Sequence, residues 1–122
     1  MKYYTDGFTI EANPSKTGGG YTIADENGEI IHREVISKIG FTNNEGEILG
    51  LLKCFEIANN GDSVSTDSIV CIGWINARKS KVRKDLNHIF AKCHDLVKQK
   101  NINLMWERRN FNLAGLHNQK NK

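Results

Sequence analysis

Alternating apolar and polar residues at the start of the chain predict a β-sheet. Residues 2–10 alternate loosely and are rich in Tyr, Phe, Thr and Ile, which is typical of a strand. Residues 20–24 and 30–36 have the same character, and the Asn27-Gly28 pair between them is the strongest short-range signal for a hairpin. We therefore expect three consecutive strands that pair as an antiparallel meander.

The pattern changes to a helical period after Thr42. The apolar residues of this first helix share one face. Residues 59–61 have the composition of a turn, so we expect the helix to end there. These apolar residues are Ile48, Leu51, Leu52, Phe55 and Ala58. A second helix is expected from about Asp85, with an apolar face made of Leu86, Ile89, Phe90, Cys93, Leu96 and Val97.

Three shorter elements complete the predicted order. The apolar run 68–74 predicts a fourth strand and residues 102–106 predict a fifth. A short terminal helix is expected from Asn112, with residues 119–122 frayed. The later strands are joined through helices and so run parallel to one another, unlike the meander. The sequence thus predicts an α/β fold, in which a five-stranded mixed sheet carries helices on both faces.

The composition is that of one globular domain spanning residues 1–122. Apolar residues make up 39% and charged residues 25% of the chain. No apolar run approaches the roughly 20 residues of a transmembrane helix, and no secretory signal precedes the first strand. The three cysteines are an odd number without a Cys-x-x-Cys spacing, so we expect reduced, partly buried thiols. We expect a cytoplasmic monomer that does not contact membranes.

The net charge of +3 hides an asymmetry between the two halves of the chain. Residues 1–77 carry 5 Lys/Arg and 11 Asp/Glu, whereas residues 78–122 carry 12 and 3. Such halves suit a protein that binds cations in one place and polyanions in another. The basic segment 78–84 either neutralises phosphates, which would make binding sensitive to salt, or forms a solvated surface.

Three carboxylates are candidate metal ligands: Asp6, Glu47 and Asp67. Asp6 follows a strand-forming stretch, and an acid in a buried strand costs several kcal/mol unless a cation or hydrogen bonds compensate it. Glu47, in the first turn of the first helix, could instead be an acid favoured by the helix dipole. Asp67, which we place at the start of the fourth strand, could instead belong to a turn.

Each carboxylate belongs to a short motif: Tyr4-Thr5-Asp6-Gly7 with Asn13-Pro14 and Gly18 to Gly20, then Thr42-Asn43-Asn44 with Glu47, and last Thr66-Asp67-Ser68. Together these motifs resemble those of ribonuclease HI. They occur in the family's order, the three acids are 41 and 20 residues apart, and the resemblance covers essentially the whole chain.

This resemblance implies an enzyme that hydrolyses the RNA strand of RNA–DNA hybrids and leaves 5′-phosphate and 3′-hydroxyl ends. It implies that Asp6, Glu47 and Asp67 are the catalytic residues. They would hold two Mg²⁺ or Mn²⁺ ions, with Asp6 bridging the pair.

The resemblance also implies that four residues bind the hybrid: Asn13, Thr42, Asn43 and Asn44. The family uses residues such as 42–44 to hold phosphate and to contact 2′-hydroxyls. A helix N-cap and turn is the other interpretation, and both can hold because a helix start offers free N–H groups to anions. Asn13 resembles a position that contacts the hybrid's minor groove, or is a turn residue before Pro14.

The chain departs from the family where a fourth acid is expected, because Gly115 stands there. A second ion would lose an anionic ligand. His117 either replaces that ligand, which would favour Mn²⁺, or faces solvent near the chain end. The alternative function is therefore a catalytically weak or inactive nucleic-acid-binding protein. Another nuclease or integrase of the same superfamily fits less well, since residues 42–44 point to hybrid recognition. We expect Trp74 in the core rather than on a substrate sugar.

Overall fold

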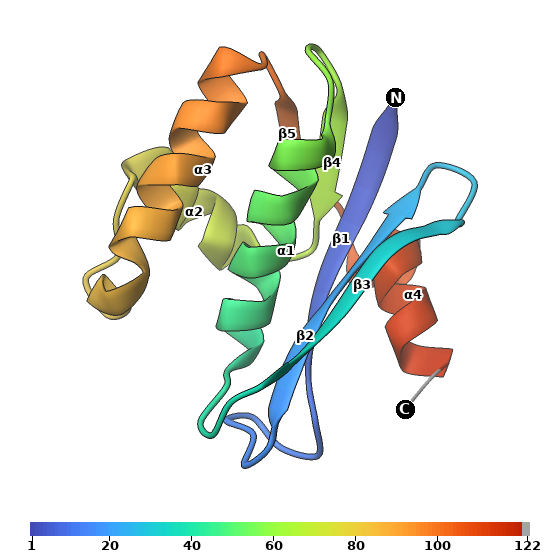
Figure 1. The fold of residues 1–122 in the computed structure, drawn as a ribbon. Coiled ribbons are helices and arrows are strands. Elements are labelled where there is room, and N and C mark those ends of the chain that lie inside the picture. Colours follow the sequence, from blue (N-terminus) through green and yellow to red (C-terminus); the bar gives the residue numbers. More distant parts are fainter. Residues whose placement is uncertain (121–122) are drawn as a thin grey trace.

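The computed structural model describes residues 1–120, and it contains most of the expected elements, with a helix in place of the strand expected at residues 68–74 (Figure 1). The strands are β1 (Lys2–Thr9), β2 (Gly18–Asp25), β3 (Ile30–Ser37), β4 (Ser63–Thr66) and β5 (Asn103–Trp106). The helices are α1 (Asn43–Ile57), α2 (Ile69–Ala77), α3 (Asn87–Gln99) and α4 (Leu113–Lys120), with 3₁₀ turns η1 (Lys84–Leu86) and η2 (Arg109–Phe111). Of the segment expected to fray, Gln119 and Lys120 are helical, while residues 121–122 lie outside the described residues.

The predicted five-stranded mixed sheet is confirmed. Its strand order is β3-β2-β1-β4-β5. β2 pairs antiparallel with β1 and β3, whereas β4 pairs parallel with β1 and β5. β1 therefore lies at the centre, between the meander and the strands that are joined through helices.

The prediction of a strand at residues 68–74 is wrong, because this segment forms α2 and β4 precedes it. The side-chain oxygen of Ser68 accepts a hydrogen bond from the Cys71 N–H and so caps the start of the helix. One face of α2 buries Cys71 and Ile75, while Ile69 is 68% exposed. A short apolar run fits a strand or a helix equally well by periodicity, so the capping serine was the signal that distinguishes them.

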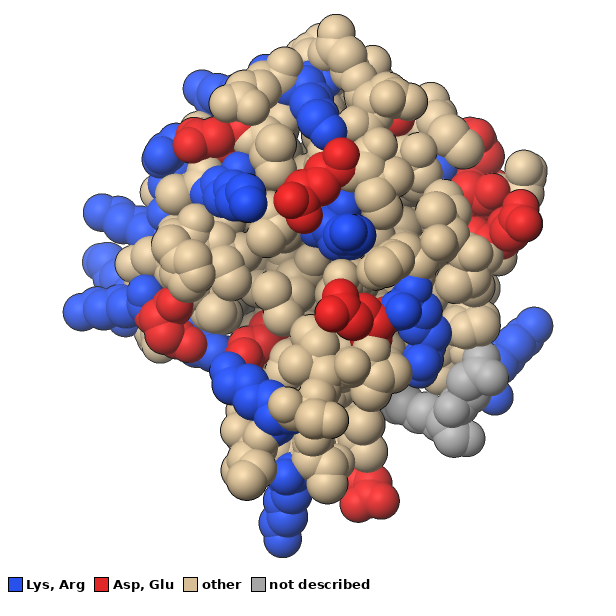
Figure 2. Space-filling view, viewed as in Figure 1, with Lys and Arg blue, Asp and Glu red and all other residues tan. Residues whose placement is uncertain are grey.

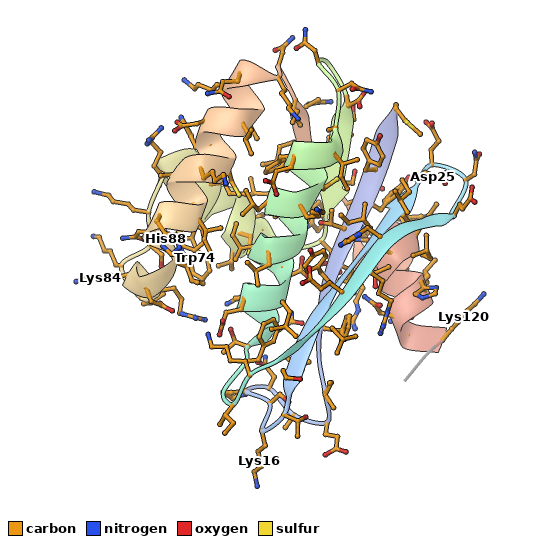
Figure 3. The ribbon with its side chains drawn as sticks, in the orientation of Figure 1. Lys16, Asp25, Trp74, Lys84, His88 and Lys120 are labelled. Carbon is orange, nitrogen blue, oxygen red and sulfur yellow. The ribbon has the colours of Figure 1, made fainter. Side chains whose placement is uncertain are left out.

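Helices cover both faces of the sheet, as predicted: α1, α2 and α3 lie on one face and α4 on the other (Figure 1). Trp74 packs against Phe90 between α2 and α3, with ring centroids 5.2 Å apart, as expected for a core residue (Figure 3). Within residues 1–120, no helix has both the length and the hydropathy that crossing a bilayer requires. The largest fully buried apolar side chains are Ile23, Phe41, Ile48, Leu51, Phe55, Val64, Ile75 and Phe90.

The three cysteines are free thiols, and all are buried more deeply than the sequence indicated. Burial raises the pKa of Cys71 and of Cys93 to about 12. Because the thiolate is the reactive form, these side chains act as small apolar residues at neutral pH.

α1 lies so close to the sheet that only glycine fits at two facing positions. A Cβ atom on Gly7 would lie 2.3 Å from the backbone nitrogen of Glu47 and 2.6 Å from the carbonyl carbon of Gly46. A Cβ atom on Gly46 would lie 2.5 Å from the backbone oxygen of Gly20 in β2. These distances are steric overlaps in a close-packed interior. The two glycines thereby let the start of α1 lie directly against β1. Glu47 lies just after the first turn and not within it as expected, because α1 begins at Asn43 and the acid of its first turn is Glu45.

We predict that Gly7→Ala lowers the free energy of unfolding by about 2–3 kcal/mol, because the added methyl group overlaps backbone atoms of α1. Urea denaturation measures this change. Gly73→Ala in α2 is the matched control, since a Cβ atom there has no neighbour within 4 Å. The control should leave stability unchanged or raise it by up to about 1 kcal/mol. Equal effects of the two substitutions would contradict the close contact.

Candidate metal centre

Three carboxylates from three elements converge beside β1. Asp6 belongs to β1 and Glu47 to α1, while Asp67 follows β4 directly. Tyr4 of β1 pairs with Ser65 of the parallel strand β4. Two residues further along the chain from each of these partners, Asp6 therefore lies next to Asp67. One oxygen of each carboxylate lies within 4.8 Å of the other two. The structure thus brings together the three acids that the sequence singled out, although Asp67 precedes a helix rather than a strand.

Glu47 is 2% exposed and is held at both of its carboxylate oxygens. Its Oε1 accepts a hydrogen bond from the Gly7 N–H at 2.9 Å, and its Oε2 accepts one from the Thr66 hydroxyl at 3.3 Å. Gly7 belongs to β1 and Thr66 to β4, so this side chain spans the two central strands. The close approach of α1 at Gly7 makes this orientation possible.

Asp6 is held by α4, on the other face of the sheet. The Asn118 Nδ2 donates to Asp6 Oδ2 at 3.0 Å, while the Asn118 Oδ1 accepts from the Thr22 hydroxyl at 2.7 Å. All three residues are buried. Asn118 was not predicted as a site residue, although its place three residues after Gly115 puts the two on one face of the helix.

Gly115 faces the cluster, at the position where the resemblance to ribonuclease HI implies a fourth acid. A Cβ atom on Gly115 would lie 3.5 Å from Cγ and 3.6 Å from Oδ2 of Asp6, which are ordinary van der Waals distances. A Cβ atom therefore fits at this position without steric overlap, whereas glycine provides none. Among residues 1–120, the group of converging ligand atoms does not include His117, the possible substitute.

Burial raises the pKa of all three acids. It is the largest cause for Glu47, whose pKa lies well above its usual value, and repulsion from Asp6 adds to it. Burial also raises the pKa of Asp6, although the hydrogen bond from Asn118 lowers this pKa in part. Burial raises the pKa of Asp67 as well, although the positive charge of the nearby Arg109 guanidinium lowers this pKa in part. Concentrated negative charge at buried positions is a condition that a bound divalent ion relieves.

A surface hollow opens beside Glu47 and Asp67. Trp106 is 49% exposed, and its Nε1 donates to the Asp67 carbonyl oxygen at 3.2 Å. Trp106 ends β5, which is parallel to β4, so residues after both strands meet at one edge of the sheet. The parallel pairing of these strands therefore indicates that Trp106, Arg108 and Arg109 lie near the site. The hollow is also lined by Asn43, Ser68, Ile69, Val70, Arg108 and Arg109.

The four residues expected to bind substrate lie around the start of α1. Thr42 is the N-cap of α1, and its Oγ1 accepts from the Glu45 N–H at 3.2 Å, as the capping interpretation predicts. Asn13, in the loop after β1, accepts through Oδ1 from the Asn43 N–H at 3.0 Å. Asn43 borders the hollow beside the carboxylates, and Asn44 follows it in the first turn. The loop after β1 and the start of α1 therefore form one continuous surface next to the cluster.

The basic segment 78–84 connects α2 to α3 and reaches the same helix start. Arg83 donates through Nη1 to Thr42 Oγ1 at 2.8 Å, and its Nη2 lies 3.2 Å from Oε1 of the buried Glu45. Lys38 also pairs with Glu45, at 2.6 Å. Lys and Arg side chains gather along the side of the molecule formed by α2 and α3, where Lys84 extends outward (Figures 2 and 3). Within this segment, Arg83 thus holds the start of α1, while Lys84 exposes positive charge to solvent.

Solved structures with a similar fold are known. No family model and no curated protein sequence matches the chain. Among solved structures, it is similar to the N-terminal RNase H domain of rv2228c from Mycobacterium tuberculosis, with 21% identity, 93% of this chain and 90% of that chain covered, and a TM-score of 0.67. It is equally similar to RNase H1 from Halobacterium salinarum, with 18% identity, 93% and 89% covered, and a TM-score of 0.67.

The fold is that of ribonuclease H. LC11-RNase H1, solved in complex with an RNA/DNA hybrid, is a third similar structure, with 23% identity, 91% and 87% covered, and a TM-score of 0.64. At these identities the likeness establishes the RNase H fold. A shared fold does not by itself establish a shared chemistry, which depends on the residues of the site.

We predict that Glu47→Gln stabilises the protein when divalent ions are absent. Burial raises the pKa of Glu47 in the folded state, so ionisation of Glu47 lowers the free energy of unfolding. This loss of stability begins as the pH rises above the usual carboxyl pKa of 4.5, and it is complete above the folded-state pKa. Gln removes this penalty and still has Gly7 and Thr66 as partners. The gain should be present near pH 7 and should shrink toward pH 4, where the carboxyl group is protonated in both the folded and the unfolded state.

Urea unfolding in EDTA at both pH values measures the gain. Added Mg²⁺ should then raise the stability of the wild-type protein much more than that of the variant. A variant that is less stable than wild type at pH 7 in EDTA would contradict the charge repulsion described above.

Proposed function

We propose that this chain is a ribonuclease H that hydrolyses the RNA strand of RNA–DNA hybrids and leaves 5′-phosphate and 3′-hydroxyl ends. The observation that carries the proposal is the cluster of Asp6, Glu47 and Asp67, whose oxygens converge within 4.8 Å beside the central strand of an RNase H fold. We assign residues 1–122 to a single domain of the ribonuclease HI type.

The donor set fits hard divalent cations. All three ligating groups are carboxylates, and Mg²⁺ and Mn²⁺ favour oxygen ligands. Two such ions, when bound, lower the pKa of the attacking water and stabilise the departing oxygen of the phosphodiester. We propose Asp6 as the ligand that both ions share, with Glu47 and Asp67 completing the set of one of them.

The residues around the cluster fix the carboxylates before substrate arrives. Glu47 is held by Gly7 and Thr66, and Asp6 is held by Asn118. Carboxylates that are already oriented need little reorganisation when charge develops on the scissile phosphate. Asp67 lines the open hollow, so a phosphate group can reach the cluster from that side.

The start of α1 is the proposed binding site for the hybrid backbone. A helix N-terminus offers N–H groups and the positive end of the helix dipole to phosphate. The Asn43 and Asn44 amides can donate to and accept from 2′-hydroxyl groups, which distinguish RNA from DNA. Thr42 and Asn13 complete this surface, and Asn13 contacts Asn43 directly.

A second candidate function is hybrid binding with weak or absent catalysis. Gly115 is the observation in its favour, because the position that faces Asp6 carries no side chain that could hold a second ion. Such a protein would keep the basic side and the surface at the start of α1 while cleaving slowly.

We predict that the protein cleaves the RNA strand of a labelled hybrid in Mg²⁺ or Mn²⁺, and that Asp67→Asn lowers kcat by roughly 10²–10³-fold, the scale expected when one charge-stabilising group is lost. Gel analysis of the labelled products measures both. Wild-type rates in the Asp67→Asn preparation would reveal a contaminating nuclease. Hybrid binding without cleavage in either metal would establish the second candidate function instead.

A further inference from the structure

The face of α4 that lies against Asp6 carries a glycine and an amide. Gly115 supplies no side chain, and Asn118 presents its Nδ2 donor to Asp6 Oδ2 at 3.0 Å. No carboxylate of the described part of α4 joins the converging group, which consists of Asp6, Glu47 and Asp67. Any ion on the α4 side of Asp6 would therefore have Asp6 as its protein carboxylate.

The orientation of the Asn118 amide is determined by its other partner. The Thr22 hydroxyl donates to Asn118 Oδ1 at 2.7 Å, which turns the amide oxygen away from Asp6 and the Nδ2 group toward it. Asn118 is 7% exposed and Thr22 is fully buried, so exchange of these partners with water is costly. Asn118 thus offers Asp6 a hydrogen-bond donor and offers a metal ion no oxygen.

The position of α4 along the sheet is fixed by a second asparagine. Asn112 Nδ2 donates to the Thr5 carbonyl oxygen at 2.8 Å, and Asn112 Oδ1 accepts from the Gly115 N–H at 3.1 Å. Asn112 is fully buried. Because these contacts flank Gly115, the helix cannot slide to bring another residue opposite Asp6 without breaking them.

We propose that α4 positions Asp6 through Asn118 instead of supplying a metal ligand, so that the protein without nucleic acid binds one divalent ion. This inference rests on the proposed function only in requiring that Asp6, Glu47 and Asp67 bind metal. The second ion of the proposed reaction then depends on phosphate oxygens that the hybrid brings.

The first test is a count of bound ions by titration with Mn²⁺, followed by the electron paramagnetic resonance signal of free Mn²⁺. Wild-type protein should bind one ion. Gly115→Asp should bind two, because a Cβ atom at that position fits at 3.5–3.6 Å from the Asp6 carboxylate and the new carboxylate adds an anionic ligand. Gly115→Asn has the same size without the charge and should still bind one.

The second test concerns the positioning role of Asn118. Asn118→Ala should keep one bound ion but weaken Mn²⁺ affinity about tenfold, as loss of a residue that orients a metal ligand typically does. Gln119→Ala, at an exposed position of the same helix, is the matched control and should change neither quantity. Thermal unfolding in EDTA confirms that each variant is folded.

Two ions bound to the wild-type protein, or unchanged affinity in Asn118→Ala, would overturn this inference while leaving the nuclease proposal standing. One ion bound without any hybrid cleavage would instead overturn the proposed function and leave this inference intact. An absence of Mn²⁺ binding in the wild-type protein would overturn both.

Discussion

The contact between Gly7 in β1 and the first turn of α1 is the constraint on which the candidate metal centre depends. Since a Cβ atom on Gly7 would overlap the backbone of Gly46 and Glu47, the helix lies against the strand at van der Waals distance. The Gly7 N–H then reaches the Glu47 carboxylate. The parallel pairing of β1 with β4 adds Asp67 to the same place. One packing contact and one strand pairing therefore assemble all three acids.

This assembly works against the stability of the metal-free protein. Burial raises the pKa of each acid, so ionisation at neutral pH opposes folding. Hydrogen bonds from Gly7, Thr66 and Asn118 offset part of this cost. A divalent ion would offset more of it, which links metal binding to folding stability. Tension of this kind between stability and function is common at catalytic sites.

Most of the sheet and the three acids could be predicted because their signals are local. The alternation of residues 2–10 and the hairpin at Asn27-Gly28 need no tertiary information, and the resemblance to ribonuclease HI was carried by short motifs around each acid. The apolar run of α2 wrongly predicts a strand, because a short apolar run has no distinctive period. The role of Asn118 has no local signal, because its partner Asp6 lies 112 residues away in sequence. Arg83 likewise meets Thr42 and Glu45 only in the folded chain.

We propose that the carboxylate cluster and the surface at the start of α1 act together on RNA paired with DNA. The most direct measurement compares cleavage of an RNA–DNA hybrid and a DNA–DNA duplex of the same sequence, in Mn²⁺, with analysis of the product ends. We predict cuts in the RNA strand alone, with 5′-phosphate and 3′-hydroxyl ends. Equal cleavage of both duplexes, or products with the phosphate on the 3′ end, would contradict this proposal.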